Sequence, residues 1–518
     1  MSRLGTPAPA PGGAPPPGGP DAPSEAPADA PILAAVARGA GLIVGGSYAA
    51  RLIGLVSTFV FARLLTDEDY GVFAIGLVFY QLMVGFTEIG LNLAVVRFRD
   101  ATREDYDTLF TLSFLRGVLL AAVMAGAGPV MAAIYDDPRL LGVFLGLALT
   151  PLLLGLVNPR FYEFEREGDF TREVAVTLTA KVTTVTVTIA LAVLTGSYVA
   201  IVAGVVADAA LRAALSYALR PALPRFSLAA FSRVFGFTGW ITLVAIFAAL
   251  NNKLDAMLFG RLTGTASAGQ LYIGAQLAEL PTRDVSVPLA RAIYPSLSAR
   301  QTDPEAVRRG FLSGCQALGA VALPASVGLA LVAPLVVPLL VGAQWDRAVP
   351  VVQIVGPVLG LQTIFGATQG YAMSVGRVGV VAAREAAFFC LRTPVLIAAL
   401  LTAGFTGGLY AVAAMGLVHC VLNGLVYARL SGRAPWEPLL AARRSVLATA
   451  AMAAAVLGAG AALPPLPDLL ALPVLVALGG LAYLAAHWLL WRGEGRPAGV
   501  EASVAGLVGG VAARLRPA

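Results

Sequence analysis

Charged side chains lie within long apolar stretches of this 518-residue sequence, and they are the residues whose types suggest chemistry. Even on a lenient insertion scale, a charge at the centre of a lipid bilayer costs about 2.5–3.5 kcal/mol, so such groups face a water-filled cavity or one another. The residues concerned are Arg51, Glu88, Arg116, Lys181, Asp208, Lys253, Asp255, Glu279, Arg283, Asp284 and Arg392.

The basic residues of this set favour an anion-binding cavity. Most of them fall in odd-numbered apolar stretches, and too few acids lie near them in the sequence to neutralise them all. Guanidinium and ammonium groups bind phosphate oxygens strongly, so the expected guest is an anion such as pyrophosphate. The predicted substrate-binding residues are Arg51, Arg116, Lys181, Asn252, Lys253, Arg283 and Arg392. The acids that would bind a coupling H⁺ or Na⁺ are Glu88, Asp208, Asp255 and Glu279.

A polar patch, Asn251-Asn252-Lys253-Leu254-Asp255, interrupts one of the apolar stretches. On a helix, positions 251 and 255 share one face while Lys253 points elsewhere. Two interpretations stay open. The patch is either an internal salt bridge to a neighbouring helix, or part of a substrate or coupling-ion site.

The elements that must position these residues are about fourteen apolar stretches, each about 20–28 residues long. A hydrocarbon core of about 30 Å needs about 20 helical residues to cross it, and lipid accepts only helices or closed barrels. The stretches are continuous rather than alternating, which excludes a barrel. Hydrophobic residues make up 58% of the chain and charged residues only 13%, far from the composition of a soluble protein. The predicted fold is an all-α polytopic membrane protein with about fourteen transmembrane helices.

The predicted spans alternate with loops of very different charge. They are residues 33–61, 70–96, 109–135, 140–161, 174–194, 198–219, 235–259, 269–289, 311–341, 349–375, 378–401, 409–430, 446–463 and 469–491. The loops after the even-numbered spans are rich in arginine, whereas the opposite set holds only Arg63, Arg139, Arg261 and Arg347. Because positive loops stay in the cytoplasm, we expect both termini there, in agreement with an even number of spans.

Several classes of function are disfavoured. The predicted outer loops are short, so none can carry the carboxylate-bearing domain that a membrane glycosyltransferase usually needs, and we expect no enzyme. Three cysteines and two histidines, scattered along the chain, form neither a disulfide framework nor a metal-ligand cluster, so no metal or cofactor is expected. The net charge of +6 fits cytoplasmic loops and gives no reason to expect nucleic acid.

An internal repeat is present in the sequence: the junction between the first and second predicted spans resembles the junction between the seventh and eighth. Residues 61–82 and 259–280 share seven identities in 22 positions, all offset by 198 residues, among them Gly71 with Gly269 and Gly76 with Gly274. The offset equals six spans, so the copies are parallel, and such repeats build two lobes with a substrate path between them. The alternative is a chance likeness between apolar helices.

The repeat divides the chain into five predicted parts. These are a disordered, Pro/Ala/Gly-rich cytoplasmic tail (residues 1–31), an N-terminal six-helix lobe (32–225), a C-terminal six-helix lobe (226–432), an appended helix pair (433–495) and a cytoplasmic tail (496–518).

Several motifs resemble a known family. They are residues 62–73 (ARLLTDEDYGVF), residues 86–91 (FTEIGL) with Arg97, residues 251–262 from the polar patch onward, and residues 288–297, which end in YPSL (294–297). They are similar to the Wzx-type polysaccharide exporters of the multidrug/oligosaccharidyl-lipid/polysaccharide flippases, over roughly residues 35–430.

The resemblance implies a V-shaped pair of six-helix lobes in a bacterial cytoplasmic (inner) membrane. It implies translocation of undecaprenyl-pyrophosphate-linked oligosaccharide by alternating access for O-antigen, capsule or exopolysaccharide biosynthesis. Cavity cations would hold the pyrophosphate, and the partners would be membrane lipids, a polysaccharide polymerase and glycosyltransferases. By position, the cations that fit are Arg51, Arg116, Lys181 and Lys253.

Two rival hypotheses remain. A cation-coupled multidrug antiporter of the same superfamily should have an acidic or apolar cavity and usually twelve spans, and both features disfavour it here. A non-transporting scaffold would need no charged interior, and a membrane glycosyltransferase would need the loop that is missing.

Overall fold

The computed structural model describes residues 30–87, 102–167, 170–229, 231, 239–298, 303–375, 377–462 and 467–496, with fewer side chains at the edges of these ranges. Glu88, the motif 86–91 beyond Thr87, Arg97, and most of both predicted tails lie outside the described residues. The side chains of Asp284 and of the motif 288–297 also lie outside them.

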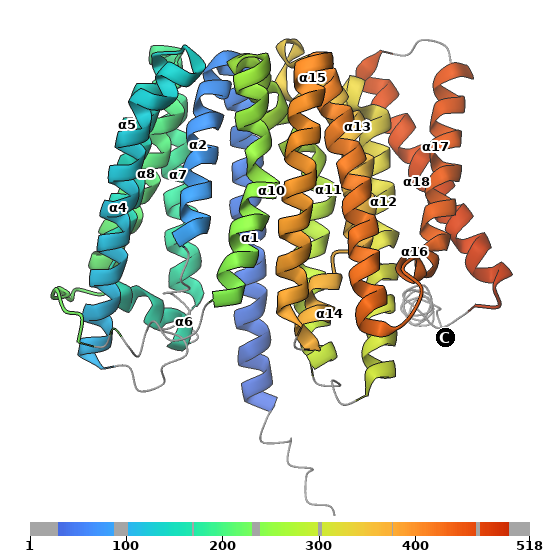
Figure 1. Ribbon diagram of the computed structural model, residues 1–518, viewed down its shortest axis with the longest axis horizontal. Helices are drawn as coiled ribbons and strands as arrows, with labels where there is room; N and C mark the ends of the chain where they lie inside the picture. Colours follow the sequence, from blue (N-terminus) through green and yellow to red (C-terminus); the bar gives the residue numbers. More distant parts are fainter. Residues whose placement is uncertain are drawn as a thin grey trace, which may run out of the picture.

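The regular elements of the described residues are all helical, which confirms the predicted all-α class (Figure 1). They are α1 (Ala30–Leu64), α2 (Asp67–Thr87), α4 (Arg103–Tyr135), α5 (Arg139–Gly155), α6 (Glu163–Glu167), α7 (Phe170–Thr195), α8 (Val199–Leu219), α10 (Gly239–Thr263), α11 (Thr265–Ser298), α12 (Pro304–Val341), α13 (Ala348–Ile364), α14 (Thr368–Ser374), α15 (Val378–Ser431), α16 (Glu437–Ala441), α17 (Arg443–Ala462) and α18 (Asp468–Gly493), with short 3₁₀ turns at Pro159–Tyr162 and Ala343–Trp345.

The longest helix, α15, counts as two membrane crossings. It has 54 residues, and Gly404 breaks it with φ 60° and ψ −149°, a conformation that side-chain-bearing residues avoid. The break lies between the predicted spans 378–401 and 409–430. Divided there, the long helices of the described ranges match the predicted fourteen crossings, and ten helices, with α15 counted once, are long and apolar enough to cross a membrane.

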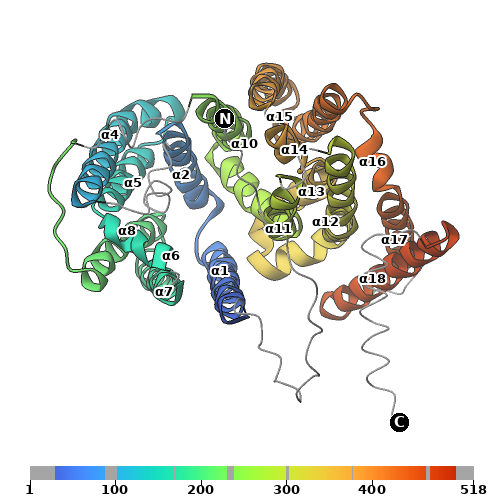
Figure 2. The ribbon, with the colours of Figure 1, turned by 90° about the horizontal axis from the view of Figure 1, so that it is seen from below.

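The helices form two groups that meet along a seam. α4, α5, α7 and α8 lie on one side and α11 to α15 on the other, with α17 and α18 packed against α12 at the far edge (Figures 1 and 2). Between the groups, α2 packs against both α10 and α11. Turns such as those after α1 and α10 lie at the top of Figure 1, which is the predicted outer end.

The seam has the two-fold symmetry that the repeat predicts. A Cβ atom added to Gly71 of α2 would lie 1.8 Å from the carbonyl oxygen of Thr265, and one added to Gly269 of α11 would lie 2.1 Å from the carbonyl oxygen of Asp67. Asp67 and Thr265 are themselves 198 positions apart, so each contact is the image of the other. This reciprocity excludes a chance likeness and confirms the two pseudo-symmetric lobes.

Polar contacts across the seam close the predicted outer end. The buried Gln270 of α11 donates to Oδ2 of Asp67 at 3.1 Å and to the carbonyl oxygen of Gln344 at 2.8 Å. The indole of the fully buried Trp345 donates to the carbonyl oxygen of Ala62 at 2.8 Å. Residues far apart in sequence are therefore joined where the helices turn.

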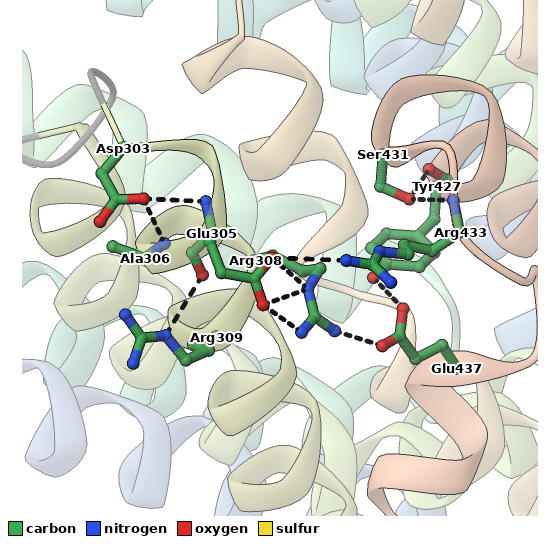
Figure 3. A network of polar contacts seen from close by, with 9 residues as sticks. All are labelled: Asp303, Glu305, Ala306, Arg308, Arg309, Tyr427, Ser431, Arg433 and Glu437. Carbon is green, nitrogen blue, oxygen red and sulfur yellow. Dashed lines mark hydrogen bonds and ion pairs between the residues drawn. The ribbon is translucent and has the colours of Figure 1, made fainter.

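A second polar network lies at the predicted inner end (Figure 3). Arg308, near the start of α12, pairs with Glu305 and also with Glu437 at the start of α16, which in turn accepts a hydrogen bond from Tyr427 of α15. The α16 segment that leads to α17 is therefore fastened to α12 and α15. Higher on α12, the carbonyl oxygen of Ala320 accepts a hydrogen bond from Tyr483 of α18 at 2.7 Å.

Candidate functional site

A cavity of about 400 Å³ lies among α10, α11, α13 and α15 and reaches α2 at the seam. Its walls combine aliphatic side chains of α13 with polar side chains of the other helices. Within the described residues it brings together these members of the predicted site: Asn252, Lys253, Asp255, Glu279, Arg283 and Arg392.

The polar patch of α10 presents two faces. Asn251 is only 6% exposed and Asp255 is half-buried, and both turn toward α15, while Asn252 and Lys253 are exposed. This is the arrangement that helical spacing dictates. The ion-pair interpretation applies to Asp255, which pairs with Arg392. Lys253 has no ion pair within 4.0 Å among the described residues, and its role in a substrate site stays a prediction.

Arginines of α15 hold the inner face of the patch in place. Arg384 pairs with Glu385 and donates to the side-chain oxygen of Asn423. The amide nitrogen of Asn251 donates to Glu385 Oε2 at 2.8 Å, and Arg392 donates to the carbonyl oxygen of Asn251 at 2.7 Å. One chain of hydrogen bonds thus links both halves of α15 to α10.

Four members of this site were missed in the sequence: Arg384, Glu385, His419 and Asn423. Arg384 and Glu385 lie within the predicted span 378–401, so the same criterion that selected Arg392 should have found them. His419 lines the cavity and stacks on Phe388 with ring centroids 4.6 Å apart. Nothing in its sequence neighbourhood indicates that contact.

The cavity keeps three charges without an ion pair. Among the described residues, Lys253, Glu279 and Arg283 have no oppositely charged group within 4.0 Å, although Glu279 and Arg283 are four residues apart on α11. Setting aside the paired groups, two cations and one acid remain. The cavity is therefore less strongly basic than a count of its arginines and lysines alone suggests.

The predicted site residues of the first lobe that the structure describes, Arg51, Arg116, Lys181 and Asp208, lie outside the set that lines this cavity. Arg116 of α4 donates to the hydroxyl of Thr87 at 3.0 Å and to the carbonyl oxygen of Val84 at 3.1 Å, so it binds the last turn of α2. Asp208 of α8 pairs with Arg212 at 2.6 Å. Neither side chain is directed at the seam cavity.

Arg51 and Lys181 form a second basic group, on α1 and α7. A Cβ atom added to Gly54 would lie 3.1 Å from Cε and 3.5 Å from Nζ of Lys181. Arg51 precedes Gly54 by one helical turn and lies over the ring of Tyr48, 5.7 Å from its centroid. Lys181 therefore lies at the α1–α7 contact, and Arg51 lies on α1 one turn before the glycine that Lys181 approaches.

A two-lobed bundle of membrane helices with a polar cavity beside the seam defines a multi-pass membrane protein built like a transporter. The family model described as polysaccharide biosynthesis protein matches residues 60–350, which is more than half of the chain. The protein belongs to this family.

Two relatives illustrate the family. The lipopolysaccharide biosynthesis protein WzxC of Escherichia coli (strain K12) is 22% identical over 383 residues, covering 72% of this chain and 76% of its own. The teichuronic acid biosynthesis protein TuaB of Bacillus subtilis (strain 168) is 23% identical over 357 residues, covering 67% of this chain and 72% of its own.

Solved structures share the fold. The lipid II flippase MurJ in an inward closed conformation superposes with a TM-score of 0.69 at 11% identity, covering 86% of this chain and 98% of its own. An inward-facing multidrug resistance MATE family transporter of the MOP superfamily superposes with a TM-score of 0.55 at 13% identity, covering 74% of this chain and 95% of its own. At these identities the likeness concerns architecture alone.

Proposed function

We propose that the protein translocates undecaprenyl-pyrophosphate-linked oligosaccharide across a bacterial cytoplasmic membrane for surface polysaccharide biosynthesis, by alternating access. Membership of a polysaccharide biosynthesis family and relatives named for lipopolysaccharide and teichuronic acid biosynthesis support this. The observation that carries the proposal is the seam cavity, in which Lys253 and Arg283 have no carboxylate within 4.0 Å among the described residues and are therefore available to a phosphate-bearing guest.

The proposal assigns roles by position. Lys253 and Arg283, with Asn252 beside them, bind the pyrophosphate, while the sugars occupy the polar cavity and the polyprenyl tail stays in lipid. Arg51 and Lys181 are the corresponding basic group of the first lobe. Arg116 positions the end of α2, since its guanidinium is occupied by that helix.

The remaining expectations belong to the same proposal. Both termini are cytoplasmic, the lobes comprise residues 32–225 and 226–432, and residues 433–495 form an appended pair. Glycosyltransferases act before the translocation step and a polymerase acts after it, and the protein itself has no catalytic residue.

A cation-coupled multidrug antiporter is the second candidate, because MATE family transporters share the fold. An organic cation needs an available acid in the cavity. Asp255 and Glu385 are each paired with an arginine, which leaves Glu279 as the unpaired acid of the described cavity, beside two unpaired cations. This excess of unpaired positive charge favours an anionic substrate over an organic cation.

The test is deletion of the gene followed by complementation. We expect deletion to abolish surface polysaccharide and to accumulate lipid-linked repeat units. Lys253→Ala combined with Arg283→Ala should fail to restore export, whereas Arg261→Ala, which removes an exposed cation of α10 outside the cavity, should restore it. Normal export by the double variant, present in the membrane at wild-type levels, would remove phosphate binding from the proposal.

A further inference from the structure

Two acids at the contact between α10 and α15 each form an ion pair with an arginine of α15. Asp255 pairs with Arg392, and Glu385 pairs with Arg384. Arg384, Glu385 and Arg392 are 7–8% exposed, so these are buried pairs rather than surface contacts. Away from this contact, Asp208 of α8 pairs with Arg212 one turn further along the same helix, and this pair is more exposed.

An acid buried among membrane helices needs a counter-charge, which can be a bound metal cation, a proton or a fixed basic side chain. Guanidinium is permanently charged in proteins and matches a carboxylate geometrically. Once a guanidinium is paired with the carboxylate, the negative charge of the acid is neutralised, and the acid no longer attracts a metal cation from solution.

We propose that Arg392 and Arg384 are tethered counter-cations that replace a coupling metal ion at the α10–α15 contact. Transport by this chain then proceeds without Na⁺ at Asp255 or Glu385. The proposal rests on the proposed function only in that coupling has meaning for a transporter, and its test measures ion binding rather than export.

Two buried oxygens, Oδ1 of Asn251 and Oδ1 of Asp255, have no hydrogen-bond partner within the described structure, and such oxygens are potential metal ligands. The position of Arg392 argues against a metal site, because its guanidinium donates both to the carbonyl oxygen of Asn251 and to Oδ2 of Asp255. A metal cation bound between these two residues would lie against a like charge in a weakly screening interior. A neutral donor such as water or a sugar hydroxyl suits the two oxygens instead.

The experiment removes the tethered charge and asks whether Na⁺ takes its place. The thermal unfolding midpoint of the purified full-length protein is measured over a NaCl titration, with choline chloride holding the ionic strength constant. We expect no specific Na⁺ effect on the wild type. Arg392→Gln should lower the midpoint in choline, and Na⁺ should raise it again in a saturable manner, because Asp255 is left without its counter-charge.

Two matched variants show where the ion binds. Arg392→Lys keeps the charge and should remain insensitive to Na⁺. Arg392→Gln combined with Asp255→Asn removes both charges and should also be insensitive, so a response confined to the single Arg392→Gln variant identifies Asp255 as the ligand.

The opposite results would overturn the proposal. A saturable Na⁺ stabilisation of the wild type that disappears in Asp255→Asn means that the acid already serves a metal ion. An Arg392→Gln variant that folds but shows no Na⁺ response also contradicts it. If Arg392→Gln does not fold, the comparison of the Na⁺ response of the wild type with that of Asp255→Asn is sufficient to test the proposal. The thermal unfolding measurements do not depend on export assays. The proposal about Arg392 can therefore be tested even if the proposed flippase function is wrong.

Discussion

Two charges of the α10 patch, only two positions apart, have opposite surroundings. Asp255 is tied to Arg392 of α15, while Lys253 is exposed to the cavity without an ion pair within 4.0 Å in the described structure. The first residue holds two helices together and the second is available to a guest. Substitutions at the two positions should therefore affect different properties.

Asp255→Asn should destabilise the protein because it leaves the buried guanidinium of Arg392 without its counter-charge. Breaking one side of a buried ion pair costs about 3–5 kcal/mol. The measurement is the unfolding free energy or midpoint in detergent. Glu279→Gln, at an exposed cavity acid without an ion pair, serves as the control and should change stability little. Equal effects of the two substitutions would contradict the assigned role of Asp255.

A pH-dependent contact lies in the turn between α4 and α5 at the predicted outer end. Burial alone would raise the pKa of Asp137, but hydrogen bonds from the side chain and backbone of Arg139 outweigh it and lower the pKa. A carboxyl group whose pKa is lowered on folding stabilises the protein above its unfolded pKa of about 3.9, and this contribution is lost as the pH falls through the folded pKa.

Asp137→Asn should therefore lower stability at neutral pH and flatten the loss of stability in the acid range. Unfolding midpoints measured from neutral pH down to about pH 3 test this. Asp136→Asn is the control, because its positive φ of 53° is one that asparagine also adopts well. If Asp137→Asn followed the wild-type acid profile, Arg139 would not be holding the carboxylate.

At the scale of helices, the closest approach in the seam is between α2 and α11. Gly71→Ala should destabilise the protein strongly, because the new methyl would overlap the carbonyl oxygen of Thr265, a backbone atom that cannot rotate away. Overpacking costs about 1–3 kcal/mol, and a clash with backbone belongs at or above the upper end. Folded yield and unfolding midpoint are the readouts.

Gly126→Ala in α4 provides the comparison, because nothing lies within 4 Å of the position a Cβ atom would take. Alanine favours a helix interior over glycine, so this substitution should be neutral or stabilising. Equal tolerance at both positions would mean that the lobes do not touch at Gly71.

The sequence predicts elements better than it predicts contacts between them. Hydropathy located the crossings and the break in α15, because these depend on local composition, and residue identities at a constant offset located the repeat. The pairing of Arg392 with Asp255 joins residues 137 positions apart, and a pattern along one helix carries no information on such an approach. In the same way, the sequence shows the charge of Arg116 but not its hydrogen bond to the carbonyl oxygen of Val84.

At the scale of the whole molecule, the two lobes are joined at the predicted outer end. Gln270, which is 2% exposed, connects Asp67 of the first lobe with the carbonyl of Gln344, and its own side-chain oxygen accepts from the backbone of Ala348 at 3.1 Å. An alternating-access cycle must break these contacts to open that end. If the protein works by the proposed alternating-access cycle, these contacts should therefore stabilise the state in which this end is closed.

Gln270→Ala should shift the conformational equilibrium toward an outward-open state. Leaving buried partners unsatisfied costs about 1–3 kcal/mol, equivalent to about a 5–150-fold change in a conformational equilibrium. The readout is the rate at which an impermeant thiol reagent, added from the outer side, labels a Lys253→Cys probe in a cysteine-free background. Ser267→Ala, which removes a hydrogen bond internal to the α10–α11 turn, is the control and should leave the rate unchanged. An unaltered rate in Gln270→Ala would contradict the gating role.

The fastening of α16 to α12 and α15 (Figure 3), together with the bond from Tyr483 to Ala320, has a consequence for how motion can be followed. The last two helices are attached to the second lobe, so in the proposed alternating-access cycle they should move with it rather than with the first. A fluorophore attached to α18 and another attached to α4 would therefore report on different lobes. A change in the distance between the two fluorophores would measure the movement of one lobe relative to the other.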